Sequence, residues 1–186
     1  GSQAVIAAEI RTRFPEDAIL GEEDTAELAP DSAMMDRVLH YTSRVSSITR
    51  PERLTDLLNA CGERSLEKSR YWIVDPIDGT RGFLRGDHYA VALALIEADH
   101  LVLGVLGCPT LDHKISDVEA GTGQIYHAVK GRGAFVRGLE DTKDCGVLVA
   151  NTGESEQAVI CESVESSHVS HGFHDGVARY RGVTDA

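Results

Sequence analysis

The sequence lacks long apolar runs, paired cysteines and an excess of positive charge. Its longest uninterrupted apolar stretch, Ala90 to Ile96, has seven residues, whereas a membrane-spanning helix needs about 18 or more. The four cysteines are far apart and form no C-x-x-C pair, which predicts free thiols in a reducing, cytoplasmic setting. Because 42% of the 186 residues are hydrophobic, the chain can still build a packed core, and we expect a soluble globular protein.

The charge balance argues against two classes of partner. Lys and Arg number 18 against 30 Asp and Glu, which gives a net charge of −12. Such a surface repels nucleic-acid backbones and anionic lipids, so we expect neither nucleic acid nor a membrane as partner. A small phosphorylated ligand remains possible if a few carboxylates recruit a cation. The sequence leaves the oligomeric state open.

Hydrophobic spacing predicts helices in the segment before Tyr71. Ile6, Ile10 and Phe14 recur every four residues, as on one face of an amphipathic helix. Pro15 would stop that helix. We also expect a short strand at 18–20, a second helix capped by Asp31 or Ser32, and a third helix with a capping box from Thr49 to Glu52.

From Tyr71 onward the sequence predicts strands. Residues 71–74 are aromatic or β-branched, and the runs 90–97 and 101–106 are separated by a short polar turn, as in a hairpin. A second hairpin is expected from 124–126 to 134–136. We place a domain boundary near Asn151. Residues 1–150 would then form an α+β metal- and phosphate-binding domain, and residues 151–186 would begin a C-terminal α/β domain with a strand at 158–161.

The hexapeptide D-P-I-D-G-T, from Asp75 to Thr80, carries the clearest chemical pattern. It follows a buried strand, and strand ends are where open α/β proteins place reactive groups. Two carboxylates, Asp75 and Asp78, favour a hard divalent cation such as Mg²⁺ or Mn²⁺, with the Ile77 carbonyl as a further oxygen ligand. If a helix starts after Gly79, its first amides would form an anion pocket beside the metal. The alternative is an ordinary Asp-Pro turn.

Other polar groups have two possible interpretations. The acidic turn at 22–24 follows a short strand and by itself could be only a solvated turn. Arg81 and Arg85 could attract an anion or be ordinary surface residues, and Cys108 and Cys161 fit core positions better than nucleophiles. The spacing of His168, His171 and His174 could suggest zinc, but Gly172 interrupts any helix there and no cysteine accompanies the set.

Taken together, these motifs resemble a known superfamily. G-E-E at 21–23, followed about fifty residues later by W-I-V-D-P-I-D-G-T, resembles the inositol monophosphatase superfamily of Mg²⁺-dependent, lithium-sensitive phosphomonoesterases. Within it, T-R-G-F-L-R-G (80–86), A-V-A-L-A-L-I (90–96), L-G-C-P (106–109) and C-E-S-V-E-S-S-H (161–168) resemble the 3'(2'),5'-bisphosphate nucleotidases. The resemblance implies a layered α/β fold, α/β/α/β/α, whose second half is incomplete in this chain.

The resemblance also implies a metal site and a reaction. Glu22, Asp75, the Ile77 carbonyl and Asp78 would bind Mg²⁺, and Thr80 together with Glu22 would be catalytic. Thr80 would help to orient the attacking water. The implied activity is hydrolysis of the 3'-phosphate of adenosine 3',5'-bisphosphate to AMP and phosphate, an activity linked to sulfate assimilation.

For the substrate, the resemblance implies that Asp78, Gly79 and Thr80 hold phosphate and that His168 contacts the nucleotide. The superfamily also has an Asp before the first helix, and W-D-x-A-G and D-S-Q-x-K-Y motifs that would follow residue 186, so we expect this chain to be part of an enzyme. Two alternatives stay open. One is a phosphatase of the same superfamily acting on inositol phosphates or fructose bisphosphate, and the other is a catalytically inactive metal-binding or interaction module.

Overall fold

The computed structural model describes residues 1–23, 32–62, 68–111, 123–151 and 153. The chain divides into two compact units, Gly1–Val147 and Leu148–Ala186, and all the helices and strands named below belong to the first. Almost all of the predicted C-terminal domain, residues 151–186, lies outside the described residues, including its strand at 158–161. That domain stays a prediction.

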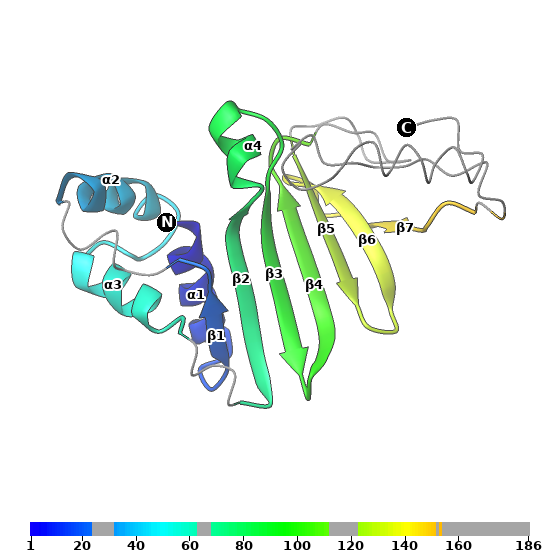
Figure 1. Cartoon of the computed structure of the whole chain (residues 1–186), viewed down its shortest axis with the longest axis horizontal. Helices are drawn as coiled ribbons and strands as arrows, with labels where there is room; N and C mark the ends of the chain where they lie inside the picture. The colour runs from blue at the N-terminus through cyan, green and yellow to red at the C-terminus, as the bar shows by residue number, and fades with distance from the viewer. Residues whose placement is uncertain (24–31, 63–67, 112–122, 152, 154–186) are drawn as a thin grey trace, which may run out of the picture. The chain divides into compact units, whose positions relative to one another are not determined.

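The described residues form a seven-stranded sheet in which the strands lie side by side in sequence order (Figure 1). Only the first pair, β1 with β2, is parallel, and each later pair is antiparallel. The strands are β1 (Ala18–Gly21), β2 (Arg70–Asp78), β3 (Ala90–Glu97), β4 (His100–Cys108), β5 (Gln124–Val129), β6 (Gly133–Gly138) and β7 (Cys145–Val147). The helices are α1 (Ser2–Arg13), α2 (Ser32–Thr42), α3 (Pro51–Asn59) and α4 (Thr80–Arg85).

Both predicted hairpins are confirmed, and turn chemistry explains the first. Between β3 and β4, Ala98 and Asp99 have φ values of 48° and 61°. Positive φ at both central residues is the geometry of a type I′ turn, whose twist matches that of the flanking strands. The second hairpin joins β5 to β6 and pairs Val129 with Gly133 across the turn.

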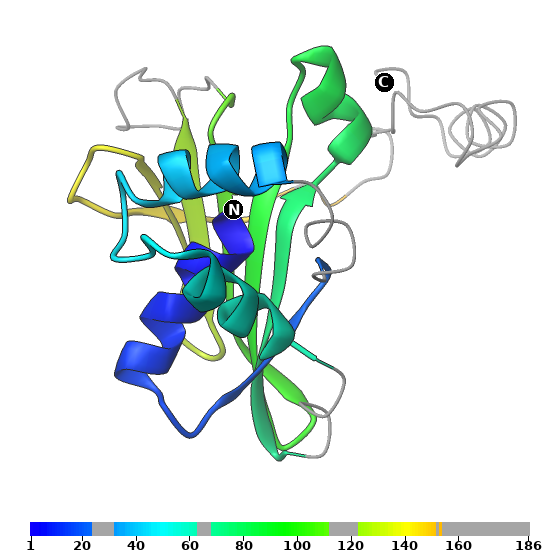
Figure 2. The ribbon, with the colours of Figure 1, turned by 90° about the vertical axis from the view of Figure 1, so that its left-hand side faces the viewer.

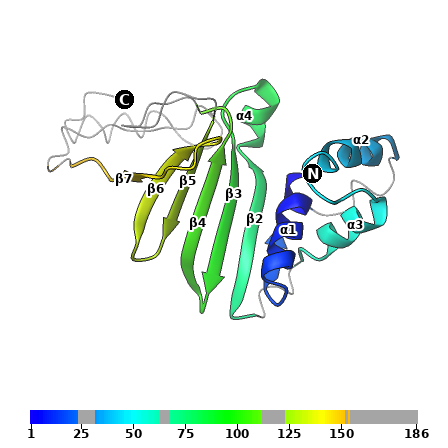
Figure 3. The same ribbon diagram turned by 180° about the vertical axis from the view of Figure 1, so that it is seen from behind.

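Helix α1 packs against the sheet at β2 and α3 packs against α1, and their buried side chains form one core with those of the sheet (Figure 2). The residues of β2 alternate, so that Trp72 and Val74 are buried against the helices while their neighbours are only partly covered. Figure 3 shows the same strands from behind. The core residues are Ala4, Ala7, Ile10, Ile19, Ile48, Leu54, Leu57, Leu58, Cys61, Trp72, Val74 and Leu95.

The Asp17 carboxylate connects the α1–β1 loop to β2 through one hydrogen bond that it accepts and one ion pair. The Trp72 indole Nε1–H donates to Asp17 Oδ2 at 2.8 Å, and Arg70 Nε lies 3.2 Å from the same oxygen. Because Asp17 directly precedes β1, these contacts help to hold β1 in register beside β2. That register sets where both strands end.

The start of α3 differs from the prediction. The N-cap residue is Arg50, no side chain caps the helix, and Pro51 is its first residue. The capping box from Thr49 to Glu52 is therefore wrong, because the fixed φ of proline suits the first helical position and starts the helix one residue later. None of the described helices is long and apolar enough to cross a membrane.

Candidate active site

The candidate site lies where the parallel strands β1 and β2 end side by side. Gly21 pairs with Val74, and the Glu22 N–H extends the pairing by donating to the Val74 carbonyl at 3.3 Å. The next residue of β2 is Asp75. Two acidic residues that are 53 positions apart in the sequence therefore meet at one edge of the sheet, the edge at which α/β proteins bind their ligands.

The side chains of Glu22 and Asp75 are close enough to share a hydrogen bond. That contact is the main cause of a raised pKa at Glu22, followed by the small loss of solvation at this exposed residue and by the negative charges of Asp75, Glu23 and Asp78. Carboxyl groups this close cannot both ionise without repulsion. A divalent cation between them would remove that repulsion.

A β-bulge separates Asp75 from Asp78. Asp75 pairs with Ala92 and Asp78 with Ala90, so β2 has one more residue than β3 over this stretch. The bulge coincides with Pro76, which has no N–H to give to a sheet ladder. We expected a turn after the strand, whereas β2 continues to Asp78. Asp75 is held in place because its Oδ1 accepts the Ile77 N–H at 3.1 Å.

Gly79 and Thr80 start the short helix α4, as expected if a helix follows the hexapeptide. Gly79 is its N-cap with φ 84°, a left-handed conformation that glycine adopts without strain. The Thr80 hydroxyl donates to the Ile77 carbonyl at 3.1 Å. Thr80 as a whole residue is exposed. The phosphate pocket expected from the amides of this helix start stays a prediction.

The structure brings two of the three predicted carboxylates together. Among the described residues, no group of three or more His, Cys, Asp or Glu side chains is arranged to hold a metal ion. Asp78 is thus not gathered with Glu22 and Asp75, although its charge acts on Glu22. All the atoms offered at this edge, including the Ile77 carbonyl, are oxygens, which suit Mg²⁺. The residues fit a hard cation, and Asp78 would have to move to complete the predicted ligand set.

The other candidate residues contribute less to this site. Arg85 forms an ion pair with Asp87, with Nε and Oδ2 2.8 Å apart, so its charge is already partly balanced. Partial burial raises the pKa of the Cys108 thiol, which disfavours the reactive thiolate, although Cys108 is half-buried and is not one of the core residues. His168 and Cys161 lie outside the described residues, as do the other histidines of the possible zinc pattern.

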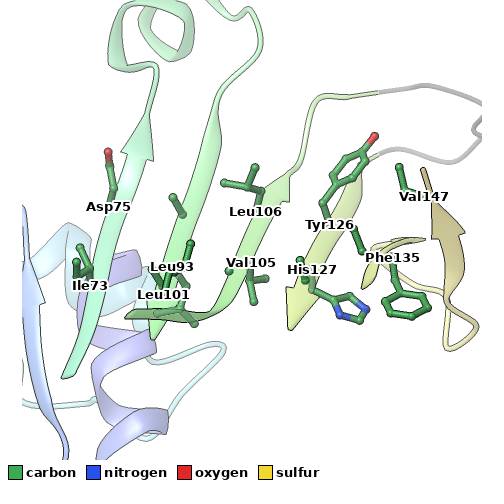
Figure 4. Close-up of a pocket in the computed structure, with 15 residues that line it drawn as sticks. Ile73, Asp75, Leu93, Leu101, Val105, Leu106, Tyr126, His127, Phe135 and Val147 are labelled. Atoms are coloured by element: carbon green, nitrogen blue, oxygen red, sulfur yellow. The ribbon is translucent and has the colours of Figure 1, made fainter. Parts of the chain in front are cut away.

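Sequence reasoning missed an apolar hollow of about 380 Å³ beside Asp75. Figure 4 shows its lining residues, with the stacked rings of His127 and Phe135 at the end away from Asp75. An apolar lining is a poor environment for a phosphate dianion, so we assign the hollow no part in phosphate binding. Its lining includes Ile73, Asp75, Leu93, Leu101, Val105, Leu106, Tyr126, His127, Phe135 and Val147.

Comparison with known proteins gives a consistent result. The sequence model of the inositol monophosphatase family matches residues 2–182. The 3'(2'),5'-bisphosphate nucleotidase 1 of Candida albicans is 38% identical over 190 residues, covering 91% of this chain and 52% of that protein. The 3'(2'),5'-bisphosphate nucleotidase of Emericella nidulans is 31% identical over 212 residues, covering 99% of this chain and 60% of that protein. The chain spans about half the length of such curated relatives.

A solved structure supports the fold. The crystal structure of 2'AMP-bound SaIMPase-II matches with a TM-score of 0.51 and 16% identity, over 97% of this chain and 51% of the other. At this identity the likeness concerns the fold alone. The predicted α/β fold class is confirmed.

Proposed function

The chain belongs to the inositol monophosphatase family, and from that membership we propose that it is the metal- and phosphate-binding part of a Mg²⁺-dependent phosphomonoesterase. The proposed reaction is hydrolysis of the 3'-phosphate of adenosine 3',5'-bisphosphate to AMP and phosphate. Relatives named 3'(2'),5'-bisphosphate nucleotidase support this substrate. Because those relatives are about twice as long, the activity is proposed for the complete natural polypeptide that contains this chain.

The observation that carries the proposal is the contact between Glu22 and Asp75 at the end of the parallel strand pair. Two ionised carboxylates in contact repel each other, so this contact disfavours the fold unless a proton or a cation lies between them. Mg²⁺ bound there would neutralise phosphate charge while water attacks phosphorus. The net charge of −12 also favours a small substrate bound through a cation over a polyanion bound directly.

The remaining roles are assigned to residues around the bulge. The Ile77 carbonyl and Asp78 complete the proposed ligand set, and the backbone at Gly79 and Thr80 holds the phosphate. The Thr80 hydroxyl, which donates to the Ile77 carbonyl at 3.1 Å, is proposed to orient water beside a ligand of the metal. His168 is proposed to contact the nucleotide, and the cytoplasmic location stays a prediction.

Comparing substrates side by side tests the proposed reaction. In the complete natural polypeptide with Mg²⁺, we expect kcat/KM to be highest for adenosine 3',5'-bisphosphate. It should be lower for an inositol monophosphate and lowest for fructose 1,6-bisphosphate. Phosphate release is the readout, and omission of Mg²⁺ is the control.

Two results would overturn this assignment. A clear preference for the inositol phosphate would move the protein to the other branch of its family. Saturable Mg²⁺ binding without phosphate release from any of the three substrates would identify a catalytically inactive metal-binding module.

A further inference from the structure

Gln3 is a polar side chain with no exposed surface, at 0% relative accessibility, in the first turn of α1. Burial of an amide is costly unless its donor and acceptor are both used. Gln3 uses both on a single residue, because its Nε2 donates to the Glu23 carbonyl at 2.7 Å and its Oε1 accepts the Glu23 N–H at 2.9 Å. The side-chain amide thus pairs with the backbone of Glu23 much as a neighbouring strand would.

The two hydrogen bonds between the Gln3 side chain and the Glu23 backbone form a clamp. This clamp completes the support of the backbone at Glu22. On one side, the Glu22 N–H is bonded to the Val74 carbonyl of β2. On the other, both backbone polar groups of Glu23 are bonded to Gln3. The backbone of the exposed Glu22 is therefore fixed before and after its side chain, and the side chain is directed to Asp75.

Gly21 provides the space that the clamp needs. A Cβ atom added to Gly21 would overlap the Gln3 side-chain amide, whose Cδ, Nε2 and Oε1 are the three nearest heavy atoms. Any larger residue at position 21 would push the amide away from Glu23. The Gln3 side chain on α1 therefore fits against β1 because residue 21 is a glycine, which has no Cβ to overlap the amide.

We propose that Gln3 is a positioning residue for Glu22, holding the turn after β1 so that the Glu22 carboxylate meets Asp75 in the geometry a metal ion requires. The proposal rests on the proposed function, since it treats Glu22 and Asp75 as metal ligands. Partners that orient a ligand commonly change metal affinity by about 10–100-fold when they are removed. Gln3 acts through the backbone and touches neither metal nor substrate.

The test is a double-mutant cycle on the 186-residue chain, with the dissociation constant for Mn²⁺ measured by calorimetry. We expect Gln3→Ala and Gly21→Ala each to raise that constant by about 10–100-fold. The double variant should bind no more weakly than either single variant, because the added methyl group has nothing left to displace. Additive losses, or a Gln3→Ala constant within about twofold of the wild type, would overturn the proposal.

Gln124→Ala is the matched control for loss of a buried glutamine. Gln124 is 2% exposed and its Oε1 accepts the Tyr126 hydroxyl at 2.6 Å, but it lies on β5 away from the site. We expect it to lower stability without changing Mn²⁺ affinity. An equal loss of Mn²⁺ affinity in this variant would show that the effect of Gln3 is one of general stability and would overturn its positioning role.

Amide hydrogen exchange separates failure of this proposal from failure of the proposed function. In Gln3→Ala, the amides of Glu22 and Glu23 should exchange faster while those of β3 and β4 stay protected. If Asp75→Asn binds Mn²⁺ as the wild type does, the metal site and the proposed function fail. Unchanged amide exchange at Glu23 in Gln3→Ala would in addition reject the clamp. If Asp75→Asn loses Mn²⁺ but Gln3→Ala does not, the function stands and the positioning role of Gln3 is wrong.

Discussion

Asp75→Asn is expected to reduce Mn²⁺ binding by the 186-residue chain by more than the roughly 100-fold that loss of an orienting partner can cost. Asparagine keeps the shape of the side chain and an Oδ1 that can still accept the Ile77 N–H, a bond of 3.1 Å in the wild type. The bulge should therefore survive, while the negative charge facing Glu22 is lost. Calorimetric titration with Mn²⁺, and with Mg²⁺ as competitor, gives the two affinities.

The control is Asp99→Asn, which removes the same charge from the exposed turn between β3 and β4. Asparagine tolerates the positive φ of 61° at that position, so this variant should fold and bind Mn²⁺ as the wild type does. Equal weakening in both variants would mean that overall charge attracts the ion. Equal affinity in Asp75→Asn and the wild type would remove Asp75 from the site.

Thr80→Ala is expected to lower kcat of the complete natural polypeptide by about 10²–10⁴-fold, the range typical of lost help with proton transfer and water orientation. KM should change little, because orientation of water is felt in the transition state and not in substrate binding. Steady-state kinetics with adenosine 3',5'-bisphosphate separate the two constants. Thr80→Ser retains a hydroxyl that can reach the Ile77 carbonyl and should keep most of the activity.

The alternative role of Thr80 is purely structural, because its hydroxyl bond to the Ile77 carbonyl ties the start of α4 to the end of β2. In that case Thr80→Ala would lower the free energy of unfolding and leave kcat within about twofold of the wild type. Urea unfolding of the same variant measures that contribution. A stability loss with unchanged turnover would end the catalytic assignment.

The sequence predicted features of the fold that depend on neighbouring residues. The apolar run from Ala90 to Ile96 and the turn after it specify a hairpin through local alternation and turn chemistry, and the structure confirms it. The start of α3 was misplaced because Pro51 outweighed the capping pattern around it. The bulge at Pro76 was missed because a strand interrupted by proline reads as a strand followed by a turn.

Two side-chain contacts between distant segments could not be predicted from the sequence. The bond from Trp72 to Asp17 joins residues 55 apart, and the clamp from Gln3 to Glu23 joins residues 20 apart, so no local pattern encodes either. One signal for Gln3 was available, since it lies a helical turn before Ile6 on the apolar stripe of α1. A polar residue in such a stripe is expected to have a buried hydrogen-bonding partner.

The sequence predicted that Glu22 and Asp75 meet, but not the geometry around them. Glu22 and Asp75 could be paired in advance because each follows a strand that the sequence predicts, at 18–20 and 71–74, and adjacent parallel strands end at the same edge of a sheet. The position of Asp78 could not be predicted. Residues three apart on a strand normally point to opposite faces, and the bulge that alters this rule arises from the pairing of β2 with β3.

Anomalous diffraction from crystals of the chain grown with Mn²⁺ tests the central claim most directly, namely that the ends of β1 and β2 form a divalent cation site. We expect one strong anomalous peak with Glu22, Asp75 and Asp78 carboxylate oxygens and the Ile77 carbonyl at about 2.0–2.6 Å, the range for hard cations with oxygen ligands. Asp78 should have moved toward Asp75 to reach it. A map with Mn²⁺ elsewhere, or with Glu22 and Asp75 still paired only to each other, would contradict the account.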